Sequence, residues 1–181
     1  YASEFRSATL DNFEWLMNIN FWGVVWSTKA FLPLLEASPN GHLINISSIF
    51  GMVGIPTQSA YNSAKFAVRG FTESLQAEYR GSSLTVTCVH PGGISTNIAL
   101  RARTDGEPAD TSAEERDASF RRVARTSSAK AAEVILKGTL AGRQRVFIGW
   151  DAWFMQILTK FLPTSYHLVT ARLASRNDES N

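Results

Sequence analysis

The sequence contains very little cysteine. Cys88 is the only cysteine among 181 residues, so no disulfide can form within the chain. Its neighbours in the segment LTVTCVH are mostly apolar or β-branched, which predicts a buried strand thiol rather than a reactive one. Because disulfides belong to oxidising compartments, a lone thiol favours a reducing one, and we expect a cytoplasmic protein.

Long apolar runs are also absent. Lys29, Pro33 and Lys160 interrupt the most apolar segments, whereas a membrane-spanning helix needs about 20 consecutive apolar residues. The opening segment YASEFRSATLDNF lacks the basic and apolar regions of a secretion signal. We therefore expect neither a transmembrane segment nor a cleavable signal.

Charge of one sign is not in excess. Lys and Arg together number 18 and Asp and Glu 16, which gives a net charge of +2. The arginines of residues 101–145 are mixed with acidic residues, unlike the unopposed basic face of a nucleic-acid-binding protein. We predict no nucleic-acid partner and no metal site.

The first half of the chain alternates between helical and strand patterns. Apolar residues recur at helical spacing from Ser7 to Ala37, with Ser7 or Thr9 as the cap and an expected kink near Asn20. A short buried strand, HLINIS, follows at residues 42–47, and helical spacing resumes from Ser59 to about Gly81. The β-branched run SLTVTCVH, halted by a Pro-Gly-Gly turn, predicts a second strand. This strand-helix-strand order predicts parallel strands joined by a right-handed crossover.

The second half continues the same α/β pattern after a polar insertion. Residues 97–126 are charged and weakly periodic, with one loose helix expected around 113–123. An amphipathic helix follows at 127–142, and RVFIG predicts a third strand at 145–149. Parallel sheets usually have five or more strands, so three are few. The sequence also opens on Tyr1 rather than on methionine, and we expect it to begin inside a longer polypeptide.

Polar side chains cluster where the first predicted strand ends and the next helix begins. Ser47 and Ser48 close the strand, and Tyr61 and Lys65 lie one helical turn apart on the following helix. In open α/β sheets, ligands bind outside the carboxyl ends of the strands. A nearby ammonium group lowers the pKa of a phenol from its usual value of about 10. The cluster therefore predicts acid/base chemistry on a hydroxyl or carbonyl group.

These residues, in this spacing, resemble the short-chain dehydrogenase/reductase family. The family pattern is a serine, a tyrosine thirteen positions later and a lysine four positions beyond, which selects Ser48 over Ser47. The segment NFWG supplies the family's asparagine as Asn20, and HPGGIST matches the turn after the second strand. The resemblance extends over about residues 11–149.

The resemblance implies roles for the matched residues. Tyr61 would donate or accept the proton, and Ser48 would orient the substrate oxygen. Lys65 would lower the pKa of Tyr61 and hold the nicotinamide ribose, while Asn20 would fix a water that relays protons to Lys65. The residues expected to contact an NAD or NADP cofactor are Asn20, Tyr61, Lys65, Pro91, Gly92, Ile94 and Thr96.

Two motifs of the family do not occur in this sequence. These are the phosphate-binding Thr-Gly-x-x-x-Gly-x-Gly turn and the Asn-Asn-Ala-Gly stretch, which precede the asparagine helix in the family. We therefore expect an N-terminally truncated, Rossmann-like doubly wound sheet whose three strands are the family's fifth to seventh. Residues 1–150 would form this part, with 97–126 as its substrate-loop insertion and 151–181 as an amphipathic C-terminal extension.

Two groups of aromatic residues, in the C-terminal segment and in the first predicted helix, are expected to make further packing contacts. The C-terminal segment WDAWFMQILTKFLPTSYHLV could cover an apolar substrate pocket, pack as core or rest on a membrane surface. Trp15, Trp22 and Trp26 are expected in the core or in subunit contacts. Because the family's corresponding helices commonly form a four-helix interface, the resemblance implies a homodimer or tetramer.

Two functions remain open at this point. The first is an NAD(P)-dependent oxidoreductase that interconverts a secondary alcohol and a ketone on a fairly apolar small molecule, through Ser48, Tyr61 and Lys65. The alternative is a non-catalytic fragment that only pairs with related subunits, because the dinucleotide-binding half is missing.

Overall fold

A three-stranded parallel sheet forms the centre of the computed structural model, which describes residues 1–106 and 112–168. Its strands are β1 (His42–Ile46), β2 (Thr85–Pro91) and β5 (Arg145–Ile148), in the order β1-β2-β5. The α/β class and all three expected strands are confirmed. Because the strands run parallel, their carboxyl ends lie at one edge, where Ile46 is paired with Val89 and Pro91 with Ile148.

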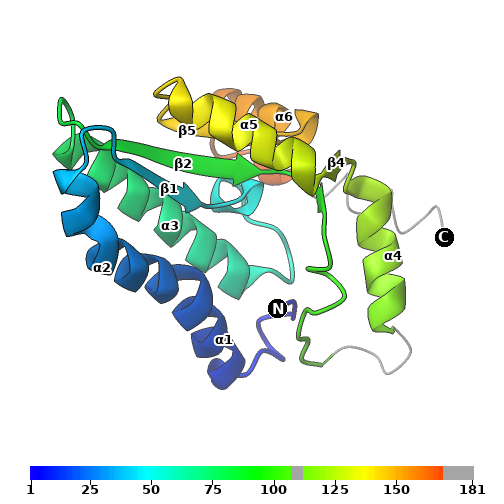
Figure 1. Cartoon of the computed structure of the whole chain (residues 1–181). Helices are drawn as coiled ribbons and strands as arrows, with labels where there is room; N and C mark the ends of the chain where they lie inside the picture. Colours follow the sequence, from blue (N-terminus) through cyan, green and yellow to red (C-terminus); the bar gives the residue numbers. More distant parts are fainter. Residues whose placement is uncertain (107–111, 169–181) are drawn as a thin grey trace.

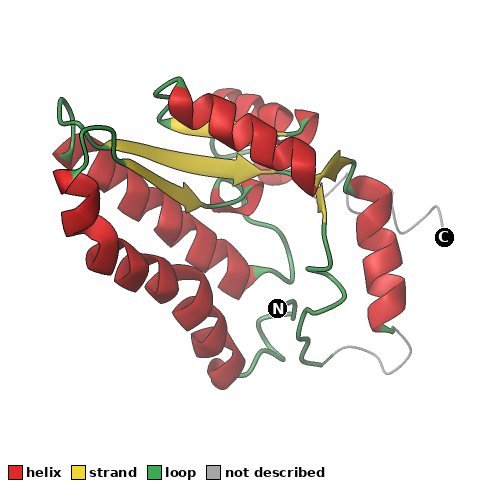
Figure 2. Cartoon of the chain, viewed as in Figure 1, coloured by secondary structure: helices red, strands yellow, loops and turns green. Residues whose placement is uncertain are grey.

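Helices cover both faces of the sheet (Figures 1 and 2). One face carries α1 (Leu10–Met17), α2 (Gly23–Ala37) and α3 (Ser59–Glu78). The opposite face carries α5 (Ser128–Leu140), while α6 (Trp150–Phe161) packs against Phe147 of β5 and Met52 of the loop after β1. The remaining described α-helix, α4 (Ala113–Val123), stands beyond the carboxyl ends of the strands and has the bounds expected from the sequence. The arrangement is the doubly wound one that the sequence predicts.

The predicted kink near Asn20 is a π-helical turn. The segment η1 (Asn18–Trp22) joins α1 to α2 without a break, so residues 10–37 form one continuous helical rod. Thr9 caps this rod, because its side chain accepts a hydrogen bond from the backbone N–H of Asn12 at 3.4 Å. Single π-helical turns inside α-helices occur frequently at functional sites.

Three short elements were not expected from the sequence. A 3₁₀ turn, η2 (Ile49–Gly51), follows β1, and a two-residue parallel pair forms between β3 (Ile94–Ser95) and β4 (Thr126–Ser127). Elements of two or three residues are too short to show a periodic pattern. Part of the predicted insertion, residues 107–111, lies outside the described residues.

Small buried clusters hold the layers together. Leu16 packs against Ala60 and Ala64 and thereby joins α1 to α3. Cys88 is buried inside β2, as expected, and burial raises the pKa of its thiol to about 11. Among the described helices, none is both long and apolar enough to cross a bilayer.

The packing of Leu16 gives a first prediction. Leu16 is 2% exposed, whereas Leu34 on the same helical rod is 69% exposed. We expect Leu16→Ala to lower the free energy of unfolding by about 2–5 kcal/mol, because a cavity opens between α1 and α3. Leu34→Ala should change it by less than about 0.5 kcal/mol. Urea denaturation of both variants measures the difference, and equal effects would contradict this packing.

Candidate active site

The two serines after β1 face different partners. The Ser47 hydroxyl donates a hydrogen bond to the backbone carbonyl of Lys65 at 2.8 Å and is fully buried. The Ser48 Oγ accepts a hydrogen bond from the backbone N–H of Phe50 at 3.1 Å and lies close enough to Tyr61 to lower the pKa of its phenol. Ser47 therefore fastens α3 to the strand end, while Ser48 is the hydroxyl that meets Tyr61.

His90 supports Ser48 from the neighbouring strand. Its Nδ1 lies 3.2 Å from the backbone carbonyl of Ser48, and its ring stacks on Phe147 with centroids 5.2 Å apart. Burial lowers the pKa of His90 to about 4, so the ring is neutral near pH 7. His90 is therefore a neutral residue near the strand end that contacts the backbone of Ser48.

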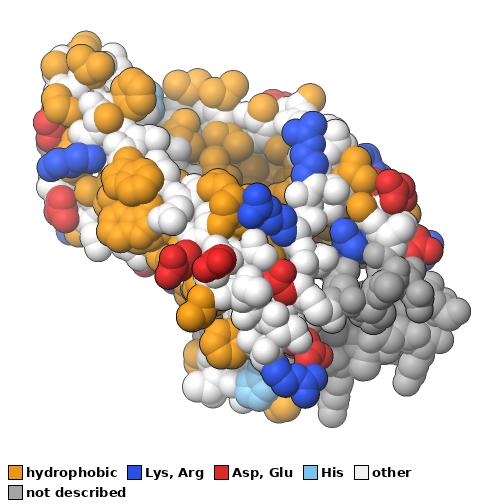
Figure 3. All heavy atoms as spheres, turned by 90° about the horizontal axis from the view of Figure 1, so that it is seen from below, with side chains coloured by type: hydrophobic (Ala, Val, Ile, Leu, Met, Phe, Trp, Pro, Cys, Tyr) orange, Lys and Arg blue, Asp and Glu red, His pale blue; other side chains and the backbone are white. Residues whose placement is uncertain are grey.

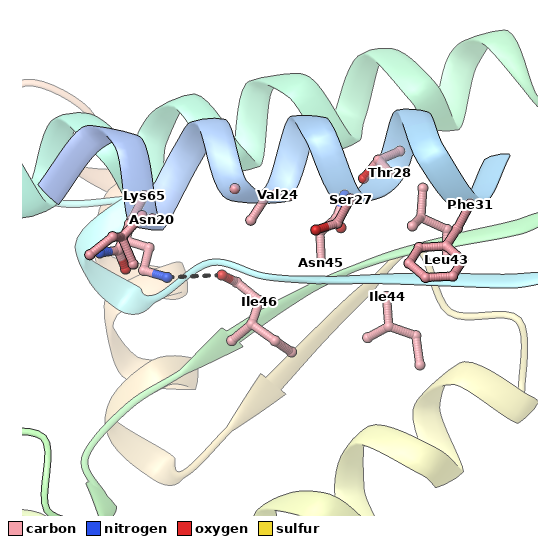
Figure 4. Close-up of a pocket in the computed structure, with 12 residues that line it drawn as sticks. Asn20, Val24, Ser27, Thr28, Phe31, Leu43, Ile44, Asn45, Ile46 and Lys65 are labelled. Carbon is pink, nitrogen blue, oxygen red and sulfur yellow. Dashed lines mark hydrogen bonds between the residues drawn. The ribbon is translucent and has the colours of Figure 1, made fainter. Parts of the chain in front are cut away.

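Tyr61 and Lys65 lie on the same face of α3, near the carboxyl end of β1. The Lys65 Nζ donates a hydrogen bond to the backbone carbonyl of Ile46 at 3.1 Å, as Figure 4 shows. The same nitrogen lies 5.6 Å from the centroid of the Tyr61 ring. The lysine is therefore adjacent to the tyrosine and also bound to the strand end.

Burial controls the ionisation of both side chains. It raises the pKa of Tyr61, against the smaller lowering effect of Ser48. It lowers the pKa of Lys65 to about 8. The expected lowering of the Tyr61 pKa is therefore not found in this structure, because removal of the phenol from water disfavours its charged form more strongly than its neighbours favour it.

Asn20, Tyr61 and Thr96 line one cavity of about 430 Å³. These three predicted site residues come from the π-helical turn, from α3 and from the segment after β3. The remaining lining residues are Tyr1, Trp15, Leu16, Asn97, Ile98, Arg101 and Ala102. Residues far apart in the sequence thus meet at the carboxyl edge of the sheet.

A second hollow runs along the outer edge of β1. It is a groove of about 550 Å³ between α2 and the strand, with Asn20 and Lys65 at one end (Figure 4). Figure 3 views the molecule from the side of α1 and α2 and shows a hollow with hydrophobic side chains at its floor. Asn20 lines both the groove and the cavity, and its Nδ2 donates to the carbonyl of Leu16 at 3.3 Å.

The Pro91–Gly93 turn is held by hydrogen bonds. Pro91 ends β2, and the N–H of Gly92 donates to the carbonyl of Ile148 at 2.9 Å. The N–H of Gly93 donates to the Asp151 carboxylate at 2.7 Å. The turn leads directly into β3, which contains Ile94, and on to Thr96 at the cavity.

Sequence reasoning missed Asn62, which shapes the loop between Ser48 and Tyr61. Its Nδ2 donates to the carbonyls of Phe50 at 2.7 Å and Val53 at 2.6 Å, and its Oδ1 accepts from the N–H of Ile55 at 3.1 Å. Asparagine is a poor former of helix interiors, so its position beside Tyr61 was a signal that could have been used. Asp151, at the start of α6, was also missed.

The C-terminal segment contacts the same loop. Ala152 and Met155 of α6 pack against Met52 and Phe147, and the hydroxyl of Tyr166 accepts a hydrogen bond from the N–H of Gly54 at 3.2 Å. One side of α6 is thus core, while Trp150 and Trp153 remain exposed. Residues 169–181 of the expected extension lie outside the described residues.

The buried ammonium of Lys65 gives a second prediction. Its pKa is about 8 in the folded chain against 10.5 for a free side chain, so between these values the unfolded chain binds more protons. The stability of the wild type should therefore rise with pH, by roughly 2 kcal/mol between pH 7 and 10 relative to Lys65→Met. Urea denaturation at several pH values measures this difference. A difference between the wild type and Lys65→Met that stays constant across this pH range would contradict the prediction.

Comparisons with known proteins agree with this geometry. The family model described as short chain dehydrogenase matches residues 2–107. A Mycobacterium tuberculosis protein named as the oxidoreductase SadH is 46% identical over 174 residues, which cover 94% of this chain. The chain spans only 62% of the length of that relative.

Solved structures of short-chain dehydrogenases share the fold. One from Burkholderia phymatum in complex with NAD has a TM-score of 0.68 at 21% identity and covers 98% of this chain and 62% of its own. Another, from Burkholderia cenocepacia in complex with NADP, has a TM-score of 0.69 at 21% identity and covers 96% and 67%. The family match, together with this fold, shows that the chain belongs to the short-chain dehydrogenase/reductase family of oxidoreductases.

Proposed function

We propose that this chain carries the catalytic residues of an NAD(P)-dependent oxidoreductase that interconverts a secondary alcohol and a ketone. The observation that carries the proposal is the meeting of Tyr61, Asn20 and Thr96 in one cavity, with Ser48 and Lys65 beside the phenol. Such a cavity brings an acid/base group and hydrogen-bonding groups to the same reacting oxygen.

The residues present fit the nicotinamide end of a dinucleotide. The backbone groups of the Gly92–Gly93 turn are already bonded, whereas Thr96 and Asn20 open into the cavity. Lys65 and Tyr61 would hold the ribose, and Ile94 and Thr96 the carboxamide. Solved relatives of this fold bind NAD and NADP, which supports a nicotinamide cofactor in general. When bound, the cofactor supplies or accepts the hydride that no side chain can carry.

The protonation states suit Tyr61 as the proton donor in ketone reduction. Burial raises its pKa, so the phenol holds its proton near pH 7. In reduction, Tyr61 gives this proton to the carbonyl oxygen as hydride reaches the carbonyl carbon, and in oxidation it takes the proton back. Ser48 donates a hydrogen bond to the same oxygen, and the Lys65 ammonium stabilises the phenolate that remains.

The cavity wall favours a fairly apolar small molecule. Trp15, Leu16, Ile98 and Ala102 are among its lining residues, and the ring of Phe50 meets that of Tyr61 edge-on with centroids 6.0 Å apart. Apolar walls with a few polar groups are typical of small-molecule sites.

A homodimer or tetramer fits the exposed surface of α2. Trp22 and Trp26 are 44% and 61% exposed and stack with centroids 6.1 Å apart. Exposed apolar patches of this kind mark protein contacts. Oligomeric state, a cytoplasmic location and contact of α6 with a membrane surface stay predictions.

One observation favours the second candidate, a non-catalytic fragment. Within the described residues, β1 pairs with β2 only, and its other edge borders the groove. The sequence also lacks the glycine-rich phosphate-binding turn. A glycine-rich strand-turn-helix encoded upstream of Tyr1 would favour the enzyme, whereas its absence would favour the fragment.

The phenol of Tyr61 gives the third prediction. In the polypeptide expressed at its natural length, Tyr61→Phe should lower turnover by about 10²-fold or more, because the proton donor is lost. Reduced cofactor should still bind, as measured by nicotinamide fluorescence. Tyr79→Phe, at the C-cap of the same helix, is the matched control, since the Tyr79 hydroxyl donates to Glu36 outside the site. Full turnover in Tyr61→Phe would refute the mechanism.

The two adjacent serines give the fourth prediction. Ser48→Ala should lower turnover by about 10²-fold with little loss of stability, because it removes a donor to the substrate oxygen. Ser47→Ala should lower the free energy of unfolding by about 0.5–1.5 kcal/mol, because the buried hydrogen bond that joins the end of β1 to α3 is lost. Steady-state kinetics and urea denaturation of both variants measure these effects. A loss of turnover in Ser47→Ala together with a loss of stability in Ser48→Ala would contradict the assignment.

A further inference from the structure

A single carboxylate links helix α6 to the turn after β2. Asp151 lies in the first turn of α6, and its Oδ2 accepts the hydrogen bond of the Gly93 N–H at 2.7 Å. Its Oδ1 accepts the N–H of Ala152 at 3.0 Å. Both carboxylate oxygens are therefore occupied by backbone donors, one in the helix and one in the turn.

Among the described hydrogen bonds of the Gly92–Gly93 turn, the one to Asp151 involves a side chain. The N–H of Gly92 donates to the carbonyl of Ile148 at 2.9 Å, and the carbonyl of Gly93 accepts from Thr126 at 3.4 Å. Those two contacts are backbone to backbone, so side-chain substitutions leave their groups in place. Only the Gly93 N–H depends on the identity of a side chain.

Two glycines, Gly92 and Gly149, make room for the carboxylate. A Cβ on Gly92 would lie 2.1 Å from both Asp151 oxygens, and a Cβ on Gly149 would lie 2.3 Å from Oδ1. Gly149 also has a φ of 92°, which side-chain-bearing residues rarely adopt. A Cβ on Gly93 would lie 2.9 Å from the Cα of Ala124. The glycines of the turn are thus required by the close approach of Asp151 and of the chain before β4.

We infer that Asp151 is a positioning residue for the cofactor: by fixing the Gly93 N–H, its carboxylate sets the path of the chain from Gly92 to Ile94 and Thr96. This inference rests on the proposed function, in which Ile94 and Thr96 hold the nicotinamide. A carboxylate that accepts backbone N–H groups forms hydrogen bonds about twice as strong as neutral ones, so the turn is held before the cofactor arrives. The first turn of α6 therefore belongs to the cofactor site, although it follows the last strand.

Asp151→Ala tests the contact, because it removes both carboxylate oxygens and leaves the Gly93 N–H without this acceptor. In the protein at its natural length, we expect amide hydrogen exchange at Gly93 to speed up about tenfold or more. The dissociation constant of NADH or NADPH, titrated by fluorescence, should rise about tenfold. Glu133→Gln, which removes an exposed carboxylate on α5, is the matched control and should change neither value.

A double-mutant cycle with Gly92→Ala separates positioning from general loosening. The added methyl group should displace the carboxylate and weaken cofactor binding in the wild-type background. In the Asp151→Ala background the methyl group meets no carboxylate, so Gly92→Ala should add little. Additive losses would show that Asp151 does not act through the turn and would overturn the inference.

The outcomes distinguish the inference from the proposed function. Unchanged exchange at Gly93 in Asp151→Ala would refute the contact itself, whatever the protein binds. Faster exchange with unchanged cofactor affinity would refute the positioning role. A wild-type protein at its natural length that binds neither NADH nor NADPH would refute the proposed function, and with it the cofactor part of this inference, while the exchange measurement would still decide the contact.

Discussion

Lys65 fastens the end of β1 to α3, and the candidate site depends on this junction. Lys65 contributes twice: its backbone carbonyl accepts from Ser47, and its Nζ donates to the carbonyl of Ile46. The two hydrogen bonds hold the end of β1 against α3. Ser48 follows the strand at this point, and Tyr61 lies in the first turn of the helix. A buried ammonium is unfavourable by itself, so the site retains it against its cost in folding free energy.

Much of the fold could be predicted because its long elements have clear periods. The helix at 113–123 and the strand at 145–148 begin and end within one residue of expectation, since caps and apolar alternation mark their limits. The π-helical turn could be anticipated only as a kink, because a polar residue at position 20 breaks the apolar pattern without revealing how the hydrogen bonds rearrange. The pair β3–β4 forms between segments about thirty residues apart, and two-residue strands carry no pattern of their own.

The candidate site, too, could be predicted only in part from the sequence. Ser48, Tyr61 and Lys65 lie within one strand-helix unit, so their spacing along the chain determines how they meet. Their protonation states could not be predicted, because the pKa of Tyr61 depends on burial by helices and loops from elsewhere in the chain. Asp151 is 58 residues from Gly93, and an aspartate in the first turn of a helix looks like ordinary helix capping until the fold brings the two together.

The π-helical turn also makes the length of the first helical rod important. Leu16, Asn20, Val24 and Thr28 follow one another at intervals of four and all face inward, toward α3, the cavity or the groove. A regular α-helix would rotate each successive member by about 40° out of this line, and the wider π turn absorbs much of that drift. Loss of one residue from the regular helix directly after this turn, such as Gly23, would rotate the residues that follow by about 100° and carry Val24 and Thr28 away from β1. Insertions and deletions in this stretch should therefore be tolerated far less than substitutions on its exposed side.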